Sequence, residues 1–220
     1  YRMLFTTSCK GAVVIMSEEK KAIVTVLLPA GRLPLDIMAE AHRLADKFNL
    51  QVYLSNAQNL RIVDVDESAV EEVKTALAAL GADFKAKGKF PLPKVCEGRD
   101  HCNLGSADTE ALSAKIVDHF SGRKHTKPKF KISISGCTLC CSGAKLVDIG
   151  VVGTKEGFEM YAGGKGGPFP KVGVRIGRKL NENEVLTMIE TLVEFHDEKT
   201  GKKQRIFKLL SDPEFPFPVV

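Results

Sequence analysis

The chain has 220 residues, of which 44% are hydrophobic and 27% are charged. At roughly 150 residues per domain, this length predicts one or two domains. The composition is that of a globular protein and excludes a disordered chain. The net charge of +5 is too small for the concentrated basic surface of a nucleic-acid-binding protein. No apolar run approaches the roughly 20 residues that cross a bilayer, and the first residues lack the apolar core of a signal peptide, so we expect a cytoplasmic protein that binds neither nucleic acid nor membrane.

The first part of the chain has the pattern of a small ferredoxin-like unit. The expected elements are a strand at 22–28, a helix at 35–48, strands at 51–55 and 60–65, and a helix that opens with a capping box at 68–71 and ends at Gly81. The order βαββα is most of a ferredoxin-like fold. Residues 85–95 are rich in lysine and proline and are expected to form a linker.

The second part of the chain is glycine-rich between 136 and 177 and predicts a further α+β unit. The expected elements are a helix at 107–121, strands at 130–135, 147–152, 157–162 and 172–176, a helix from 181 to 199, a short basic helix near 202–210 and an extended proline-rich end. The fold class is therefore α+β. We expect two domains, a ferredoxin-like half domain over 1–85 and a second domain over 86–220.

Four of the six cysteines form two spaced pairs, Cys96 with Cys102 (CX5C) and Cys137 with Cys141 (CX3C), and glycines flank both pairs. Clustered cysteines in a reducing compartment bind metal more often than they form disulfides. Glycine lets the backbone approach a bulky inorganic group closely. Four thiolates from two loops are therefore typical of a [4Fe–4S] cluster.

Other ligand sets remain open at this point. A zinc site is one alternative, although its cysteines are usually two to four residues apart and a five-residue gap fits poorly. A CX2C pair that ends at Cys140 is a second alternative. Cys9 stands alone near the start of the chain, and we expect it to be an ordinary thiol with no ligand role.

Three motifs together resemble the sulfite/nitrite reductase haemoprotein family, and within it the small, single-unit assimilatory-type sulfite reductases. The run from Gly136 to Gly153 (GCTLCCSGAKLVDIGVVG) resembles the signature GCPNxC…DIGxxG. The run SNAQNL at 55–60 resembles a T-x-x-Q-N element, and YAGGKGG at 161–167 resembles a glycine turn that follows the haem strands. Two departures stand out: Thr138 and Leu139 replace Pro-Asn, and Ala57 replaces a common arginine.

The resemblance implies two cofactors, a [4Fe–4S] cluster and sirohaem, and so makes 86–220 the domain that binds them. It implies that the cluster is held by Cys96, Cys102, Cys137 and Cys141. Cys141 would also ligate the sirohaem iron. The further cofactor-binding residues that it implies are Gln58, Asn59, Arg99, Gly163 and Gly164.

The substrate anion needs cations around it, and the resemblance points to Lys129 and Lys131 as the lysine pair that contacts it. We expect the run Lys129-Phe130-Lys131 to be a strand, so that both lysines share a face. A solvent-facing strand edge protected by lysines is the alternative. Arg61, just after the 55–60 element, is a further expected basic residue of the pocket, with an ordinary surface arginine as the alternative.

The function implied is the six-electron reduction of sulfite to sulfide. The alternatives are a sirohaem nitrite reductase, a non-enzymatic [4Fe–4S] electron carrier and a zinc-stabilised binding domain. The sequence contains neither a GxGxxG that opens a helix nor a P-loop, so we expect an external donor such as ferredoxin or flavodoxin. The basic stretch 199–205 is one expected docking surface. The chain is expected to be a monomer or a twofold homodimer, in which the lysines and cysteines of opposite copies would meet.

Overall fold

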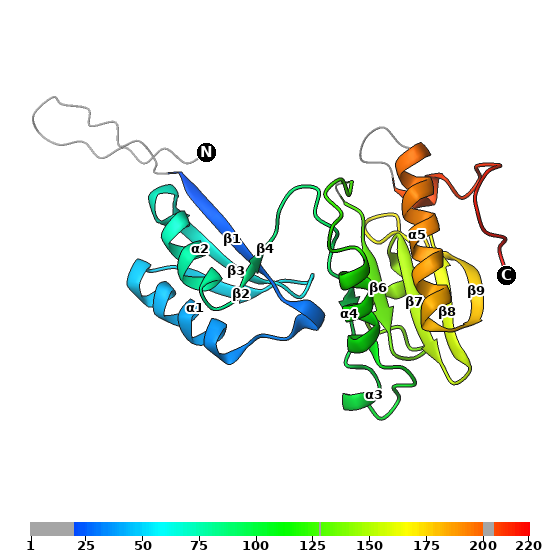
Figure 1. Cartoon of the computed structure of the whole chain (residues 1–220), viewed down its shortest axis with the longest axis horizontal. Helices are drawn as coiled ribbons and strands as arrows, with labels where there is room; N and C mark the ends of the chain where they lie inside the picture. The colour runs from blue at the N-terminus through cyan, green and yellow to red at the C-terminus, as the bar shows by residue number, and fades with distance from the viewer. Residues whose placement is uncertain (1–19, 128, 200–204) are drawn as a thin grey trace, which may run out of the picture.

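The computed structural model describes residues 20–127, 129–199 and 205–220. Two α+β units lie side by side, and each has one β-sheet with helices against it (Figure 1). Within the described residues, no helix combines the length and apolar character needed to span a membrane.

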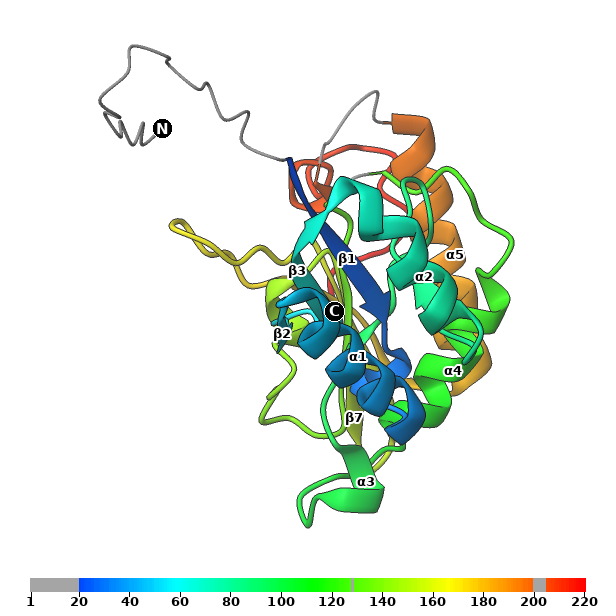
Figure 2. The same cartoon turned by 90° about the vertical axis from the view of Figure 1, so that its left-hand side faces the viewer.

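The first unit is a four-stranded antiparallel sheet with the order β2-β3-β1-β4. Its elements are β1 (Lys21–Leu27), η1 (Pro29–Gly31), α1 (Leu35–Phe48), β2 (Gln51–Leu54), β3 (Leu60–Asp66), η2 (Glu67–Ala69), α2 (Val70–Ala78) and β4 (Asp83–Phe84). Alternate residues of β1 and β3, such as Val26 and Ile62, are buried against Leu44 and Leu77 of the helices. α1 and α2 therefore lie together on one face of the sheet, nearest the viewer in Figure 2.

The βαββα prediction for this unit is confirmed and extended by a strand, because β4 pairs with β1 through Val26 and Phe84. The predicted capping box is wrong. The turn η2 precedes the helix, Ala69 occupies the N-cap, and no side chain caps it. The predicted stop at Gly81 fits the structure, since Gly81 has φ +81° just after the helix, a conformation that glycine adopts without a steric cost.

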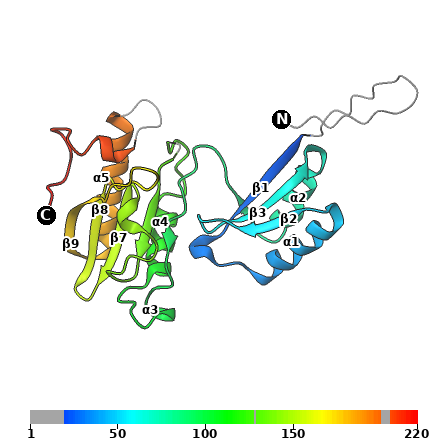
Figure 3. The ribbon, with the colours of Figure 1, turned by 180° about the vertical axis from the view of Figure 1, so that it is seen from behind.

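The second unit is a five-stranded mixed sheet with the order β5-β6-β7-β8-β9. Its elements are β5 (Lys94–Val95), α3 (Gly98–His101), α4 (Thr109–His119), β6 (Ile132–Ser135), η3 (Ala144–Leu146), β7 (Ile149–Thr154), β8 (Gly157–Ala162), β9 (Val174–Leu180), α5 (Glu182–Lys199) and η4 (Ile206–Lys208). β5, β6 and β7 are parallel, while β8 and β9 continue antiparallel. Seen from behind, β7, β8 and β9 lie beside one another (Figure 3).

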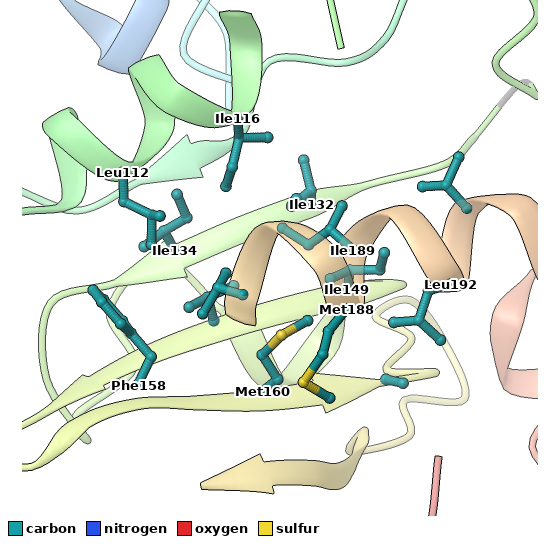
Figure 4. Packing of buried hydrophobic residues seen from close by; sticks show 14 of the residues in the cluster. Leu112, Ile116, Ile132, Ile134, Ile149, Phe158, Met160, Met188, Ile189 and Leu192 are labelled. Atoms are coloured by element: carbon teal, nitrogen blue, oxygen red, sulfur yellow. The ribbon is translucent and has the colours of Figure 1, made fainter. Parts of the chain in front are cut away.

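One face of this sheet carries the main hydrophobic core. Ile134 and Met160 of the sheet pack with Leu112 and Ile116 of α4 and Ile189 of α5 (Figure 4). The start of α5 is fixed by a reciprocal pair in which the Glu184 N–H donates to Asn181 Oδ1 and the Asn181 N–H donates to Glu184 Oε2, at 3.0 and 2.8 Å. The alternation of Ile and Ser along β6 therefore turns its isoleucines toward the helices.

The other face is crossed by residues 136–148, which connect β6 to β7. The hydroxyl of Ser142 is hydrogen-bonded to those of Ser133 and Ser135, at 2.9 and 2.6 Å. A Cβ on Gly150 would lie 1.9 Å from the carbonyl oxygen of Ala144, so only glycine allows this crossing. The serines of β6 thus hold the cysteine-containing crossover against the sheet.

Several boundaries differ from the predictions. The expected linker contains β5, α3 was not predicted, and β6 begins only at Ile132, so Lys129, with φ +73°, and Lys131 precede the strand. Of the expected basic helix, residues 202–204 lie outside the described residues and the rest forms only the short turn η4. The C-terminal end is not extended throughout, because the Asp212 N–H donates to the Leu209 carbonyl and the Phe215 N–H donates to the Asp212 carbonyl, both at 3.0 Å, as in turns.

The two units are joined by specific contacts. The Gln58 side-chain amide donates to the Val95 carbonyl and its oxygen accepts from the Val95 N–H, both at 2.8 Å. Arg32 donates through two nitrogens to Glu110 of α4, at 2.9 and 2.7 Å. These contacts attach the first unit to β5 and α4.

Candidate functional site

The two cysteine loops begin at the same edge of the second sheet. β5 and β6 are parallel neighbours, so their carboxyl ends lie together. Cys96 follows β5 directly, and Gly136 and Cys137 follow β6. The Cys96 N–H donates to the Ile134 carbonyl at 3.2 Å, and the Gly136 N–H donates to the Cys96 sulfur at 3.0 Å. The parallel pairing thus brings together two cysteines that are far apart in sequence.

Glycines allow the two loops to touch through their backbones. A Cβ on Gly136 would lie 2.8 Å from the Cα of Gly98, and one on Gly105 would lie 2.4 Å from the Gly98 oxygen. The N–H groups of Ser106 and Ala107 both donate to the Gly136 carbonyl, at 2.7 and 3.1 Å. The loop of Cys96 and Cys102 is therefore held against the loop of Cys137.

Cys140 and Cys141 have opposite surroundings. Cys140 packs beside Ala144, Val152 and Tyr161, and its sulfur accepts the Lys145 N–H at 3.3 Å. Cys141 is exposed. The thiol of Cys140 is thus occupied within the protein, whereas that of Cys141 is accessible to a ligand. This difference favours the CX3C spacing.

The donor chemistry fits an iron–sulfur cluster. A [4Fe–4S] cube takes one thiolate on each iron, and hydrogen bonds to the sulfurs tune it. Two glycine-packed loops supply the thiols, and Gly136 already supplies such a hydrogen bond. A pocket of about 370 Å³ opens beside Cys137. Within the described residues, no three His, Cys, Asp or Glu side chains converge on the position of a single metal ion.

The residues expected from the first unit have different environments. Both ends of the Gln58 amide are engaged by Val95, so this side chain joins the two units. The Oδ1 atom of Asn59 is buried and has no hydrogen-bond partner among the described residues. Arg61 of β3 is opposite Thr25 of β1 in the sheet, and its guanidinium carbon lies 5.4 Å from the centroid of the Tyr53 ring, on the sheet face opposite the helices. Asn59 is the one of these with an unused polar atom.

Arg99 lies on α3 inside the first cysteine loop. Its side chain is 60% exposed and stands 3.6 Å from Asp100 and 3.7 Å from Asp108. Such exposed ion pairs contribute little to stability. The guanidinium is therefore available to an anionic group beside the cysteines.

The lysine pair lies at the start of β6. Both Lys129 and Lys131 are exposed. Lys131 and Cys137 are six positions apart, a span of roughly 20 Å at strand spacing. The crossover shortens the separation from Cys141, because Ser142 is bonded to Ser133 in the middle of the strand. The structure thus places the lysines far from the first cysteine of the crossover and nearer to its last.

The glycine turn lies at the same end of the sheet as the lysines. The Gly163 N–H donates to the Asp148 carbonyl at 2.9 Å. A Cβ on Gly164 would lie 2.5 Å from the Lys145 carbonyl, so the turn is packed directly on the crossover. Residues that the resemblance assigns to haem and to substrate therefore share one end of the sheet.

Two charged residues at this end were not predicted as site residues. Asp148 belongs to the quoted DIG motif, but its type alone gave it no role. Arg205 was expected on a docking surface, yet it donates to Asp148 at 2.6 Å, and Lys199 pairs with Asp212 and Glu214. Residues 200–204 of that stretch lie outside the described residues. Burial raises the pKa of Asp148, an effect that Arg205 partly opposes.

Known proteins are similar to this chain in sequence and in fold. An assimilatory-type sulfite reductase of Nitratidesulfovibrio vulgaris is 29% identical over 203 residues, which are 91% of this chain and 91% of that protein. The large subunit of the NADH nitrite reductase of Escherichia coli is 24% identical over 188 residues, but this chain spans only 22% of its length. The structure of the Mycobacterium tuberculosis NirA protein has the same fold, with a TM-score of 0.72 and 21% identity over 85% of this chain and 37% of that one.

Two family descriptions match consecutive parts of the chain. The ferredoxin-like half domain of nitrite/sulfite reductases matches residues 16–80, and the 4Fe-4S domain of nitrite and sulphite reductases matches residues 92–213. The second match covers more than half of the chain and includes all four cysteines of the two pairs. The chain therefore belongs to the nitrite and sulphite reductase family of oxidoreductases, which carry a [4Fe–4S] cluster and sirohaem.

Proposed function

We propose that this protein is an assimilatory-type sulfite reductase that reduces sulfite to sulfide. The observation that carries this proposal is the pair of cysteine loops joined at one sheet edge, with Cys141 exposed beside an inward-turned Cys140. In this proposal Cys96, Cys102, Cys137 and Cys141 hold the cluster. The similarity to a sulfite reductase over nearly the whole of both chains supports sulfite as the substrate.

The cofactor pair would pass electrons from the external donor to the anion, and Cys141 would help to hold both the cluster and the sirohaem. The protein supplies cations and protons. Lys129, Lys131 and Arg61 would attract the anion and stabilise negative charge on the oxygens that leave as water. The ammonium groups of the lysines would also donate protons to those oxygens.

Other residues would bind the cofactors. Arg99 would pair with a carboxylate of the tetrapyrrole, and Asn59, whose buried Oδ1 has no partner among the described residues, would donate to another carboxylate through its side-chain amide nitrogen. Gly163 and Gly164 would let the macrocycle approach the backbone closely. Gln58 would act indirectly, by attaching the first unit to β5 beside Cys96.

The domain division and the partners belong to the same proposal. The chain would divide into domains at 1–85 and 86–220, and electrons would come from a cytoplasmic carrier such as ferredoxin or flavodoxin, since no nucleotide-binding motif was found in the sequence. A monomer would use its own lysines. A twofold homodimer would bring the lysines of one copy to the cysteines of the other.

Nitrite is the second candidate substrate. Nitrite reductases match more than four-fifths of this chain, and nitrite is also a small anion whose oxygens must be protonated and removed. The two substrates make the same demands on thiolates and cations. Steady-state kinetics with each anion would separate them.

The test starts with the protein isolated anaerobically. We expect a Soret band, a red-region band of a reduced-ring tetrapyrrole, and four iron and four acid-labile sulfide per chain. With reduced methyl viologen as donor, kcat/KM should be higher for sulfite than for nitrite. A protein that shows cluster absorption alone, even after sirohaem reconstitution, would instead be an electron carrier. A higher kcat/KM for nitrite than for sulfite would make nitrite the substrate.

The lysine assignment has its own control. Changing Lys129 and Lys131 to Ala should lower kcat/KM for sulfite while the cofactor content stays unchanged, because the lysines touch the anion and not the cluster. Lys179, an exposed lysine paired with Glu156 on the β8–β9 side, is the matched control. If kcat/KM for sulfite were the same in the double variant and in Lys179→Ala, Lys129 and Lys131 would be ordinary exposed lysines next to a strand.

A further inference from the structure

Asp148 is a buried carboxylate at the start of β7. Its side chain is 1% exposed, and it is the only acidic side chain buried to this extent among the described residues. Burying a carboxylate is unfavourable unless it is paired and hydrogen-bonded. The partners of Asp148 therefore indicate why this position tolerates a charge.

Each oxygen of Asp148 binds a different part of the chain. Oδ2 accepts the backbone N–H of Lys131 at 3.0 Å. Oδ1 accepts from the Arg205 guanidinium at 2.6 Å and from the Ile206 N–H at 3.4 Å. One carboxylate thus ties the residue before β6 to the C-terminal segment.

The backbone around Asp148 extends the same connection to the glycine turn. Its carbonyl accepts the Gly163 N–H at 2.9 Å, and the Ile149 N–H donates to the Lys131 carbonyl at 3.2 Å. A second nitrogen of Arg205 lies 3.5 Å from the Gly164 carbonyl. Lys131, the glycine turn and Arg205 are therefore all attached to the same two residues.

Lys131 needs such a support because it lies outside the strand. Regular ladder bonds of β6 begin at Ile132, and Lys129 has a left-handed backbone with φ +73°. Without Asp148 the backbone of Lys131 would keep only its carbonyl bond to Ile149. A charge-assisted, buried hydrogen bond is stronger and more directional than a neutral one at the surface.

We propose that Asp148 and Arg205 form a positioning pair, which fixes the backbone of Lys131 at a set distance from the Gly163–Gly164 turn. The pair does not touch the anion. It would act through Lys131, and this part of the inference rests on the proposed function. The placement of the Lys131 backbone does not depend on that function and is tested separately.

The first experiment measures deuterium exchange of the cofactor-loaded protein by mass spectrometry. Arg205→Gln and Asp148→Asn should speed exchange in the peptide that contains Lys131, because its N–H loses a fixed acceptor. Arg175→Gln is the matched control: it removes the same charge from a half-buried pair with Glu159 on β8 and β9, which does not reach Lys131. Unchanged exchange in a folded Arg205→Gln protein, or an equal rise in Arg175→Gln, would overturn the inference.

The second experiment measures sulfite kinetics of the same variants. Misplacing Lys131 should raise the KM for sulfite by at least about tenfold and should also lower kcat, because the proposed proton donor is displaced. Neither constant should change in Arg175→Gln. Arg205→Lys keeps the positive charge but not the planar guanidinium, so its KM for sulfite should lie between those of the wild type and Arg205→Gln. This variant tests the pair even if Asp148→Asn fails to fold. An unchanged KM in Arg205→Gln, where Lys131→Ala raises it, would overturn the positioning role.

The two proposals fail in different ways. If Lys131→Ala itself leaves the KM for sulfite unchanged, the assignment of this lysine in the proposed function is wrong. The exchange experiment then still decides whether Asp148 and Arg205 hold the backbone of Lys131.

Discussion

Two adjacent residues of one type, Cys140 and Cys141, have opposite surroundings. Cys140 has a positive φ of 59°, and its sulfur points toward Val152 and Tyr161 and accepts a backbone N–H. Cys141 is exposed. The backbone turn between them, rather than the residue type, decides which of the two cysteines is exposed.

Serine substitutions at the two positions should therefore differ. Cys141→Ser should abolish sulfite reduction and the magnetic coupling between haem and cluster, because the shared thiolate is lost. Cys140→Ser should keep iron, acid-labile sulfide and activity, because its sulfur only accepts a hydrogen bond. Iron analysis and electron paramagnetic resonance of both proteins check this. Full activity in Cys141→Ser, or cluster loss in Cys140→Ser alone, would indicate that Cys140, and not Cys141, is the cofactor ligand.

The charge of Asp148 makes a prediction about pH. Burial raises its pKa above the ordinary value of 3.8, and Arg205 opposes the rise. The native state thus binds more protons than the unfolded state above pH 3.8, so this group lowers stability as pH rises through the native pKa. Arg205→Gln removes the opposing charge, which raises the native pKa further.

The stability lost in Arg205→Gln should accordingly be small in acid and grow toward neutral pH, where it should reach about 3–5 kcal/mol, the usual cost of an unpaired buried charge. Urea unfolding across this pH range measures it. Arg175→Gln should lose less, because the carboxylate it leaves is 18% exposed rather than 1%. A loss that is independent of pH would show that Asp148 is not the group responsible.

At the scale of elements, the parallel pairing of β5 and β6 creates the cysteine site. Cys96 follows β5 directly, Cys137 follows β6 after Gly136, and glycines let the two loops touch. β5 has only two residues, so periodicity could not predict it. The pairing with β6, and not the local sequence, makes this segment a strand.

Glycine packing at this edge should be essential for cluster loading. In Gly136→Ala the added Cβ would meet the Cα of Gly98 at 2.8 Å, and backbone atoms on both sides leave it little room to move. We expect a large fall in iron per chain. Gly122→Ala is the control, since its Cβ would meet nothing within 4 Å. Equal iron contents in the two proteins would contradict the close packing of the loops.

At the scale of the whole molecule, the first unit is attached to the second by few polar contacts. Gln58 makes two hydrogen bonds with Val95, one residue before Cys96. The Arg32–Glu110 pair is half-exposed and contributes little by comparison. Gln58 thus helps to place the first unit against the cysteine edge, together with Ala30 of η1, which packs on the main hydrophobic core.

Gln58→Ala should leave the Val95 N–H and carbonyl without partners, at a cost of about 1–3 kcal/mol for each group that stays buried. We expect the two units to separate more easily, with faster proteolysis in the 85–93 connection. Glu110→Gln, which weakens the exposed Arg32–Glu110 pair, should not increase the rate of proteolysis. Cleavage at the wild-type rate in Gln58→Ala would show that other contacts join the units.

The sequence by itself determined the α+β class, most helices and strands, and the two cysteine pairs. Hydrophobic periodicity predicted α1, which buries Ile37, Ala41 and Leu44 along one face, and the capping residues at 181–184 predicted the start of α5. Cysteine spacing indicated the cluster, because thiolates at these intervals suit a four-iron cluster, and the family resemblance implied sirohaem. These signals are local in the chain and need no knowledge of distant contacts.

Only the tertiary structure decided the rest. It showed that Lys131 lies before β6 and not within it, that Cys140 points inward, and that Gln58 binds Val95. It also paired Asp148 with Arg205, which are separated by 57 positions. These properties depend on which segments meet in space, and a carboxylate or guanidinium in a sequence does not reveal its partner until the fold brings the two together.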